Sequence, residues 1–154
     1  MEISIREITR NDLAKVAELF DLYRQFYEQV PNIDRAYEFI ADRFNKNESV
    51  ILVAENSKEE LVGFCQLYPT FCSVEAAPIY SLYDLFVLPA ARKLGVGKAL
   101  LLAAETKAIA EGKVRMDLTT AKTNLSAQSL YESLGWQRDN VFYAYNRNLN
   151  QENK

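Results

Sequence analysis

A strand–loop–helix segment, residues 83–100, constrains the fold of this chain more than any other part of its sequence. An apolar stretch, Tyr83–Leu88, runs through a proline into a basic loop with two glycines, and the loop opens directly into an Ala- and Leu-rich helix. This order gathers backbone N–H groups, a helix N-terminus and three cations, Arg92, Lys93 and Lys98, around one small space. Such a space suits a phosphate group.

The glycine spacing excludes two common phosphate-binding loops. A P-loop needs Gly, four residues, then Gly-Lys-Ser/Thr. Gly97 and Lys98 fit its end, but Arg92 stands at its first glycine and no hydroxyl follows the lysine. The dinucleotide fingerprint needs a third glycine where Leu100 stands. What remains is Arg-x-x-Gly-x-Gly, with its first glycine at Gly95, or an ordinary strand–turn–helix with a glycine kink.

A second motif, residues 124–136, narrows the choice. The loop resembles the acetyl-coenzyme A loop of the GNAT N-acetyltransferase family, Gln/Arg-x-x-Gly-x-Gly/Ala, and residues 124–136 resemble that family's second signature, Asn-x-x-Ala-x-x-Leu-Tyr-x-x-x-Gly-Phe/Trp. Asn124 and Tyr131 project from one helix face, because they lie about two turns apart. The alternative is that Asn124 is only an N-cap and Tyr131 only a core aromatic. Two motifs in the right order favour the family.

Hydrophobic periodicity predicts ten elements in the order β-α-α-β-β-β-α-β-α-β. The expected strands are 3–8, 50–55, 61–68, 79–88, 114–118 and 142–148, and the expected helices run from a capping box at Thr9 to about Gln29, then over 34–45, 96–110 and 124–134. The order matches the mixed α/β (α+β) sheet of the family. The resemblance further implies that the strands ending near Leu88 and Leu118 splay apart, with the pantetheine arm in the wedge between them.

Composition limits the class of protein. The chain has 154 residues, 49% hydrophobic and 25% charged, which predicts one domain, 1–149, with a polar tail, 150–154. A net charge of −3 argues against nucleic acid as a partner, and no apolar run approaches a membrane span. The first residues suggest a strand rather than a secretory segment, and with only two cysteines, Cys65 and Cys72, they predict a cytoplasmic protein with free thiols.

The sequence contains no histidine. This excludes a Ser-His or Cys-His nucleophile and any His-based metal site, and no metal is expected. It is compatible with direct transfer of an acyl group, without a covalent intermediate on the protein.

The resemblance also assigns the cofactor contacts. Leu85, Phe86 and Val87 offer backbone groups to the pantetheine and acetyl end of acetyl-CoA. The residues expected at the pyrophosphate are Arg92, Lys93, Gly95, Val96, Gly97 and Lys98. Lys93 and Lys98 can also be explained as solvated surface charges. Asn124 is expected to bond the amide arm of the coenzyme.

Two residues are the catalytic candidates. Tyr131 is the candidate general acid, because a phenol of pKa near 10 can protonate a leaving thiolate whose conjugate acid lies near 8.5. Asp84 is the candidate for holding the acceptor ammonium or accepting its proton, although a surface or structural carboxylate explains it equally well. Glu28 and Glu75 are weaker candidates for the same role.

The acceptor is expected between the first two helices and residues 68–83. Tyr27, Glu28 and Tyr83 are its candidate binding residues, within an aromatic set that also includes Tyr23, Phe26, Tyr68, Phe71 and Tyr80. Aromatic faces with carboxylates suit a cationic amine, although seven aromatics near a sheet also suit a core.

These inferences predict an acetyl-CoA-dependent N-acetyltransferase. Two segments, residues 22–27 and 84–87, resemble the small histone/polyamine-acetyltransferase subgroup of the family. A small amine, polyamine or amino acid is favoured as acceptor over a basic peptide. Protein-lysine or N-terminal acetylation is one alternative, and a non-catalytic acyl-CoA sensor is another. Relatives are often dimers, so a homodimer stays open.

Overall fold

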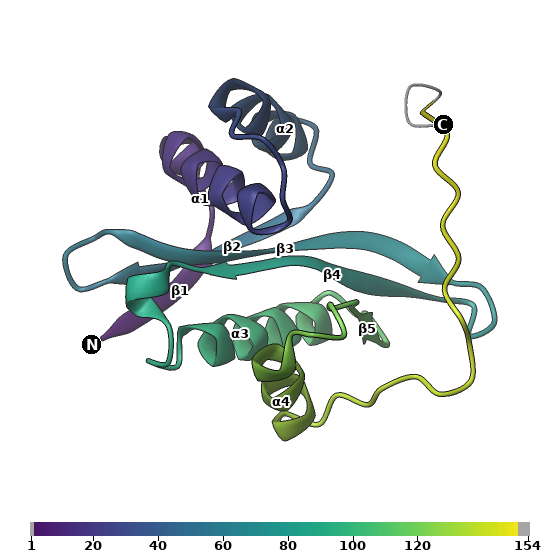
Figure 1. Ribbon diagram of the computed structural model, residues 1–154. Helices are drawn as coiled ribbons and strands as arrows, with labels where there is room; N and C mark the ends of the chain where they lie inside the picture. Colours follow the sequence, from purple (N-terminus) through teal and green to yellow (C-terminus); the bar gives the residue numbers. More distant parts are fainter. Residues whose placement is uncertain (1, 151–154) are drawn as a thin grey trace. The chain divides into compact units, whose positions relative to one another are not determined.

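The computed structural model describes residues 2–150, which fall into two compact units divided after Thr119 (Figure 1). The first unit contains β1 (Ile3–Glu7), η1 (Arg10–Asp12), α1 (Leu13–Phe26), α2 (Ile33–Asn45), β2 (Val50–Asn56), β3 (Leu61–Cys72), β4 (Ala77–Val87), η2 (Pro89–Ala91), α3 (Val96–Ala110) and β5 (Met116–Asp117). The second unit contains α4 (Leu125–Ser133). The predicted mixed α/β fold is confirmed, and so is the predicted helix 96–110.

The sheet of the first unit has the strand order β1-β2-β3-β4-β5. β1 to β4 pair antiparallel, and β5 pairs parallel to β4. Figure 1 shows α1 and α2 on one face of this sheet and α3 on the other. Apolar side chains of α1, α2 and the strands between them form the core on the first face, with Val16, Ile40, Val53 and Phe64 completely buried. No helix within residues 2–150 is long and apolar enough to cross a membrane.

The predicted capping box at Thr9 is present and joins the first strand to the first helix. The Asp12 carboxylate accepts hydrogen bonds from the Thr9 N–H at 2.7 Å and from the Arg6 guanidinium at 2.7 and 3.0 Å. Arg6 also reaches Glu55 of β2 at 3.2 Å. The bonds from Arg6 and Thr9 lower the pKa of Asp12 to about 2. This network stabilises the fold at a distance from the candidate site.

A β-bulge in β4 decides which of its side chains face α1. Gln66 pairs with Asp84, but Leu67 pairs with Leu82, so Tyr83 is an extra residue in β4. Before the bulge, the Tyr80 ring lies 4.7 Å from Lys113 Nζ, next to the end of α3. Because a bulge shifts the two-residue alternation by one, Asp84 comes to face α1.

The edge of β4 that faces β5 is paired over only two residues. Tyr80 and Ser81 pair with Met116 and Asp117. In the part of the chain that the structure describes, the β4 residues after Ser81 have a strand neighbour on the β3 side alone. The predicted strand 114–118 is therefore shortened to a two-residue pairing, and the predicted separation of the two strands is confirmed.

Three predicted boundaries are wrong. Residues 142–148 form no strand, because an alternating pattern gives strand propensity but not the neighbouring N–H and C=O groups that a ladder needs. The first helix ends at Phe26 rather than near Gln29. β3 continues past Tyr68 to Cys72, because Pro69 is accommodated opposite Tyr80 in the pairing with β4.

Candidate active site

The loop between β4 and α3 presents a row of open backbone donors. Lys93 (φ 64°) and Gly95 (φ 83°) have left-handed conformations, and α3 begins at Val96. The first N–H of α3 with a backbone acceptor is that of Ala99, which bonds the Gly95 carbonyl at 3.0 Å. Among residues 2–150, no acceptor is found for the N–H groups of residues 93–98. These donors lie at the positive end of α3, an arrangement that is suited to an anion.

The cations of this loop have no carboxylate within ion-pair distance in the described chain. Lys93 and Lys98 are exposed. Arg92 is anchored, because its Nε donates to the Val87 carbonyl at 2.9 Å and its guanidinium carbon lies 5.6 Å from the Phe86 ring centroid. In a chain with an excess of acidic residues, a loop of unpaired cations and open N–H groups is suited to a polyanion.

Gly95 is required at its position by backbone conformation. Its φ of 83° is disfavoured for residues with a Cβ, whereas a Cβ built on Gly95 would meet no atom within 4 Å. Gly97, by contrast, lies in the first turn of α3. For Gly95, therefore, packing within the protein leaves room for a side chain, and the demand for glycine comes from its backbone conformation.

The backbone of β4 leads from the bulge to this loop. Leu85, Phe86 and Val87 pair with Cys65, Phe64 and Gly63 of β3, and their other edge is the one that lacks a strand neighbour in the described chain. Phe86 is 7% exposed and belongs to the core. Backbone groups alternate between the two edges of a strand, and the Phe86 carbonyl faces Gly63 of β3 while the Val87 carbonyl accepts from Arg92. The open edge is therefore left to the backbone groups of Leu85 and the N–H of Val87.

Asp84 is a buried carboxylate within a line of hydrogen bonds. It is 4% exposed, and Gln66, which is completely buried, donates to its Oδ2 from Nε2. Ser49 Oγ in turn donates to Gln66 Oε1 at 2.7 Å. Burial raises the pKa of Asp84, and hydrogen bonds from Gln66 and Tyr23 offset part of this rise. A buried carboxylate whose pKa is raised is a candidate proton acceptor.

Tyrosines surround the outer side of Asp84. Tyr23 Oη donates to the Tyr83 carbonyl at 3.1 Å, and its ring packs edge-on against Tyr27 at 5.2 Å between centroids. Tyr68 packs against Tyr83 at 5.4 Å. Burial and the charge of Asp84 raise the pKa of Tyr23 and Tyr68, so both phenols stay protonated at neutral pH.

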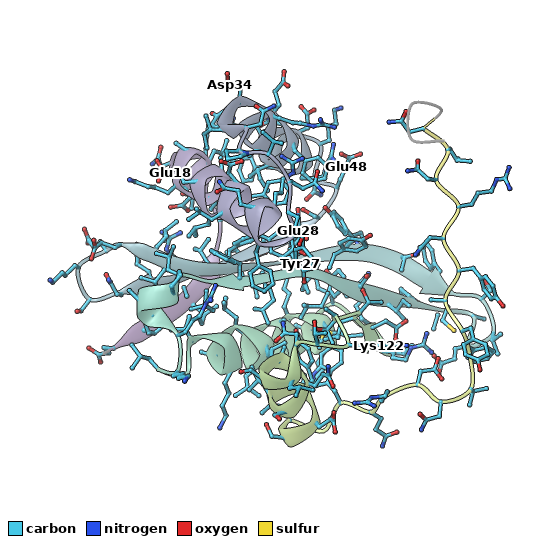
Figure 2. The ribbon with its side chains drawn as sticks, in the orientation of Figure 1. Glu18, Tyr27, Glu28, Asp34, Glu48 and Lys122 are labelled. Atoms are coloured by element: carbon cyan, nitrogen blue, oxygen red, sulfur yellow. The ribbon has the colours of Figure 1, made fainter. Side chains whose placement is uncertain are left out.

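The exposed members of the predicted acceptor site lie around this cluster. Tyr27 and Tyr83 are 45% and 67% exposed. Figure 2 shows Tyr27 and Glu28 at the end of α1 over the sheet, whereas Glu18 and Asp34 lie on the outer side of the helices. The predicted aromatic set is divided, because Tyr80 is 4% exposed near α3 and Phe71 lies far along β3, 75% exposed. Glu75 is paired with Arg115 at 3.0 Å.

Three residues of this site were missed by the sequence prediction. Gln66 and Ser49 were not identified, and Tyr23 was assigned only to the aromatic set. The sequence does contain one signal, since Gln66 is the single polar residue in the apolar run Leu61–Tyr68. A polar side chain in such a strand needs a buried partner. The identity of that partner depends on strand register, which the sequence does not state.

The second unit contains the other two predicted residues, Asn124 and Tyr131. Asn124 is the N-cap of α4, and its Oδ1 accepts from the Ala127 N–H at 3.2 Å. Tyr131 is partly exposed, with its ring 6.0 Å from that of Trp136. The Trp136 N–H donates to the Tyr131 carbonyl at 3.0 Å, and Gly135 (φ 93°) follows the end of the helix. Asn124 therefore caps the helix that carries Tyr131.

The sequence of this chain is similar to those of known acetyltransferases. The sequence model of the acetyltransferase (GNAT) family matches residues 16–136, which include both motifs. The chain is 44% identical over 147 residues to the uncharacterized N-acetyltransferase YhfO of Bacillus subtilis, covering 96% of this chain and 98% of that protein.

Solved structures of acetyltransferases have the same fold as this chain. The crystal structure of a probable acetyltransferase has a TM-score of 0.89 at 34% identity, covering 98% of this chain and 99% of that one. An aminoglycoside N-acetyltransferase in complex with CoA has a TM-score of 0.80 at 19% identity, with 95% of each chain covered, and thus shares the fold. The phosphate-type loop, the open β4 edge and these matches together show that the chain belongs to the acetyltransferase (GNAT) family.

Proposed function

We propose that this acetyltransferase moves an acetyl group from acetyl-CoA directly to the amine of a small cationic acceptor. The observation that carries the proposal is the loop of residues 93–98, where open N–H groups and unpaired cations lie next to the open edge of β4. Arg92, Lys93, Gly95, Val96, Gly97 and Lys98 would hold the pyrophosphate of the coenzyme. The backbone of Leu85, Phe86 and Val87 would bind its pantetheine arm and polarise the acetyl carbonyl.

The remaining roles belong to side chains. Tyr131 would protonate the departing thiolate, and Asn124 would bond the amide arm as well as cap α4. Asp84 would take the proton that the acceptor ammonium must lose before it can attack. Tyr27, Glu28 and Tyr83 would bind the acceptor, since aromatic faces and a carboxylate attract an ammonium group.

A small amine is favoured over a protein substrate because Tyr23, Tyr68 and Tyr83 gather around the buried carboxylate of Asp84. Acetylation of a protein lysine or N-terminus is the alternative acceptor class. A non-catalytic acyl-CoA sensor is the alternative without chemistry. It would need the loop but neither a buried carboxylate beside the acceptor side nor Tyr131.

The proposal also covers the extent of the domain, the cellular location and the oligomeric state. Residues 1–149 act as one N-acetyltransferase domain with the tail 150–154, since the family match spans both units. The reaction takes place in the cytoplasm, consistent with the unpaired Cys65 and Cys72. A homodimer would give residues 142–148 the strand neighbour that they lack within the described chain, and size-exclusion chromatography with light scattering tests this.

The deciding experiment follows free thiol release from acetyl-CoA with a panel of polyamines, amino acids, aminoglycosides and basic peptides. Turnover of a small amine supports the proposal. Turnover of the peptides alone favours the protein-acetylation alternative. No turnover together with a rise in melting temperature on adding acetyl-CoA favours the sensor, and no thermal shift contradicts the assignment of the loop.

A further inference from the structure

The Tyr23 hydroxyl lies between Asp84 and the backbone of the β4 bulge. Its Oη is 3.1 Å from the Tyr83 carbonyl oxygen, and it interacts with the neighbouring Asp84 carboxylate, so that each group shifts the pKa of the other. A phenol carries one proton but can also accept. Ionised Asp84 would therefore take the Tyr23 proton into its hydrogen bond. Protonated Asp84 would donate to Oη, and the phenol proton would then turn to the Tyr83 carbonyl.

An acceptor amine cannot readily reach Asp84 itself, because the residue is 4% exposed. Gln66, which donates to this carboxylate, is completely buried, whereas Tyr23, which interacts with it, is partly exposed. Tyr23 also contacts Tyr27, which is exposed at the end of α1. The path from the acceptor side to the carboxylate therefore passes through Tyr23.

We propose, resting on the acetyltransferase function above, that Tyr23 relays the proton of the acceptor ammonium to Asp84, and that Gln66 and Ser49 position Asp84 to receive it. One N–H bond of the ammonium breaks as its proton bonds to Tyr23 Oη. In the same step the O–H bond of Tyr23 breaks as its proton bonds to an Asp84 oxygen. The products are a neutral amine, a neutral phenol and a protonated carboxyl group.

This exchange avoids a tyrosinate, which burial beside Asp84 disfavours. The neutral amine then attacks the thioester carbonyl, and the carbon–sulfur bond breaks as CoA leaves. Asp84 returns its proton to water along the same path after the products depart. No further reactant is needed, because the net reaction converts an ammonium and acetyl-CoA into an amide, CoA and one proton.

Ser49 fixes the orientation of the Gln66 side-chain amide, and Gln66 in turn holds Asp84. Ser49 Oγ donates to Gln66 Oε1, so Gln66 Nε2 is turned toward Asp84. The titratable neighbours that act on Asp84 or its phenols lie on several elements. They are Tyr23 of α1, Tyr27 at its end, Cys65 and Tyr68 of β3, Tyr83 of β4 and, through Tyr68, Arg43 of α2. Burial raises the pKa of Tyr23, Tyr68 and Cys65, so these groups stay uncharged at neutral pH and ionisation of Asp84 should dominate the acid side of the rate profile.

Tyr23→Phe tests the relay, since it keeps the ring packing and removes only the hydroxyl. With the fastest acceptor of the panel, kcat should fall by roughly 10²-fold, as for loss of a general base, while the KM for acetyl-CoA is unchanged. The decrease of kcat at low pH that protonation of Asp84 causes in the wild type, called here the acid limb, should disappear. Tyr37→Phe, on the exposed side of α2, is the matched control and should retain the wild-type profile.

Ser49→Ala tests positioning. Without the Ser49 hydroxyl, the Gln66 amide is less firmly held and stabilises ionised Asp84 less well. The loss of kcat at low pH should therefore begin at a higher pH, without a change in KM. Ser49→Thr keeps the hydroxyl and should restore the wild-type profile. Carbon-13 NMR titration of the Asp84 carboxyl gives a readout without turnover, and its pKa should rise in Tyr23→Phe because a donor is lost.

A Tyr23→Phe variant with wild-type kcat and an intact acid limb overturns the relay and leaves the proposed function standing. A wild type that acetylates no amine overturns both.

Discussion

Gln66 and Asp84 lie directly opposite each other in the pairing of β3 and β4, and the amide of one donates to the carboxylate of the other next to the bulge at Tyr83. Both side chains are buried. Placing a carboxylate there carries a free-energy cost, and such costs are common where a protein retains a group for function rather than stability.

Asp84→Asn should therefore separate stability from activity. Because burial raises the folded-state pKa of Asp84, the native state holds its proton more tightly than the unfolded chain does. The stability of the wild type then decreases as pH rises from the unfolded pKa toward the raised folded value. The amide removes a buried group whose ionisation costs stability, so the melting temperature at pH 7 should be unchanged or higher, whereas acetyl transfer should fall by about 10²-fold. A lower melting temperature would show that Asp84 is a structural residue.

Gly97→Glu should abolish coenzyme binding without unfolding the protein. A glutamate in the first turn of α3 would place bulk and negative charge among the open N–H groups of the loop, where the proposed pyrophosphate lies. Calorimetric titration with acetyl-CoA measures the loss. Leu102→Glu, exposed further along α3, is the control and should bind normally. Unchanged affinity of Gly97→Glu would remove the pyrophosphate from this loop.

Tyr131→Phe should lower kcat by about 10²-fold while coenzyme binding persists, because the ring remains and only the proton donor is removed. Pre-steady-state thiol release measures the chemical step directly. Tyr145→Phe, 90% exposed in the second unit, is the matched control. Equal rates in both variants would transfer the role of general acid to another group or to water.

The Arg6–Asp12 pair should make the fold sensitive to acid. Its bonds lower the pKa of Asp12 from 3.8 to about 2. That stabilisation is complete above pH ~4 and is lost as pH falls through about 2. Asp12→Asn should therefore lower the free energy of unfolding by up to about 2 kcal/mol at pH 7, by the usual 1.4 kcal/mol per pKa unit, and should match the wild type near pH 2.

Urea denaturation at pH 7 and pH 2 measures this difference. Asp42→Asn, on the exposed side of α2, should show little effect at either pH. An equal loss at both pH values would mean that the carboxylate charge of Asp12 is not the source of its stabilisation.

The sequence by itself determined the features that depend on local pattern. The order of elements as far as α4, the bounds of α3 and the turn conformation at Gly95 all follow from short-range rules on periodicity, glycine and helix ends. The order of the two motifs was enough to indicate the family. Tyr131 and Asn124 could likewise be named from their spacing, although their catalytic roles stay predictions.

Only the tertiary structure decided which residues meet. The pairing of Gln66 with Asp84, which lie 18 residues apart in the chain, and the bulge at Tyr83 that turns Asp84 toward Tyr23 depend on the register between β3 and β4. Residues 142–148 are a second example. Their alternating pattern predicted a strand, but within the described chain no other strand pairs with them. Register is set by long-range packing of whole faces, so no local pattern encodes it.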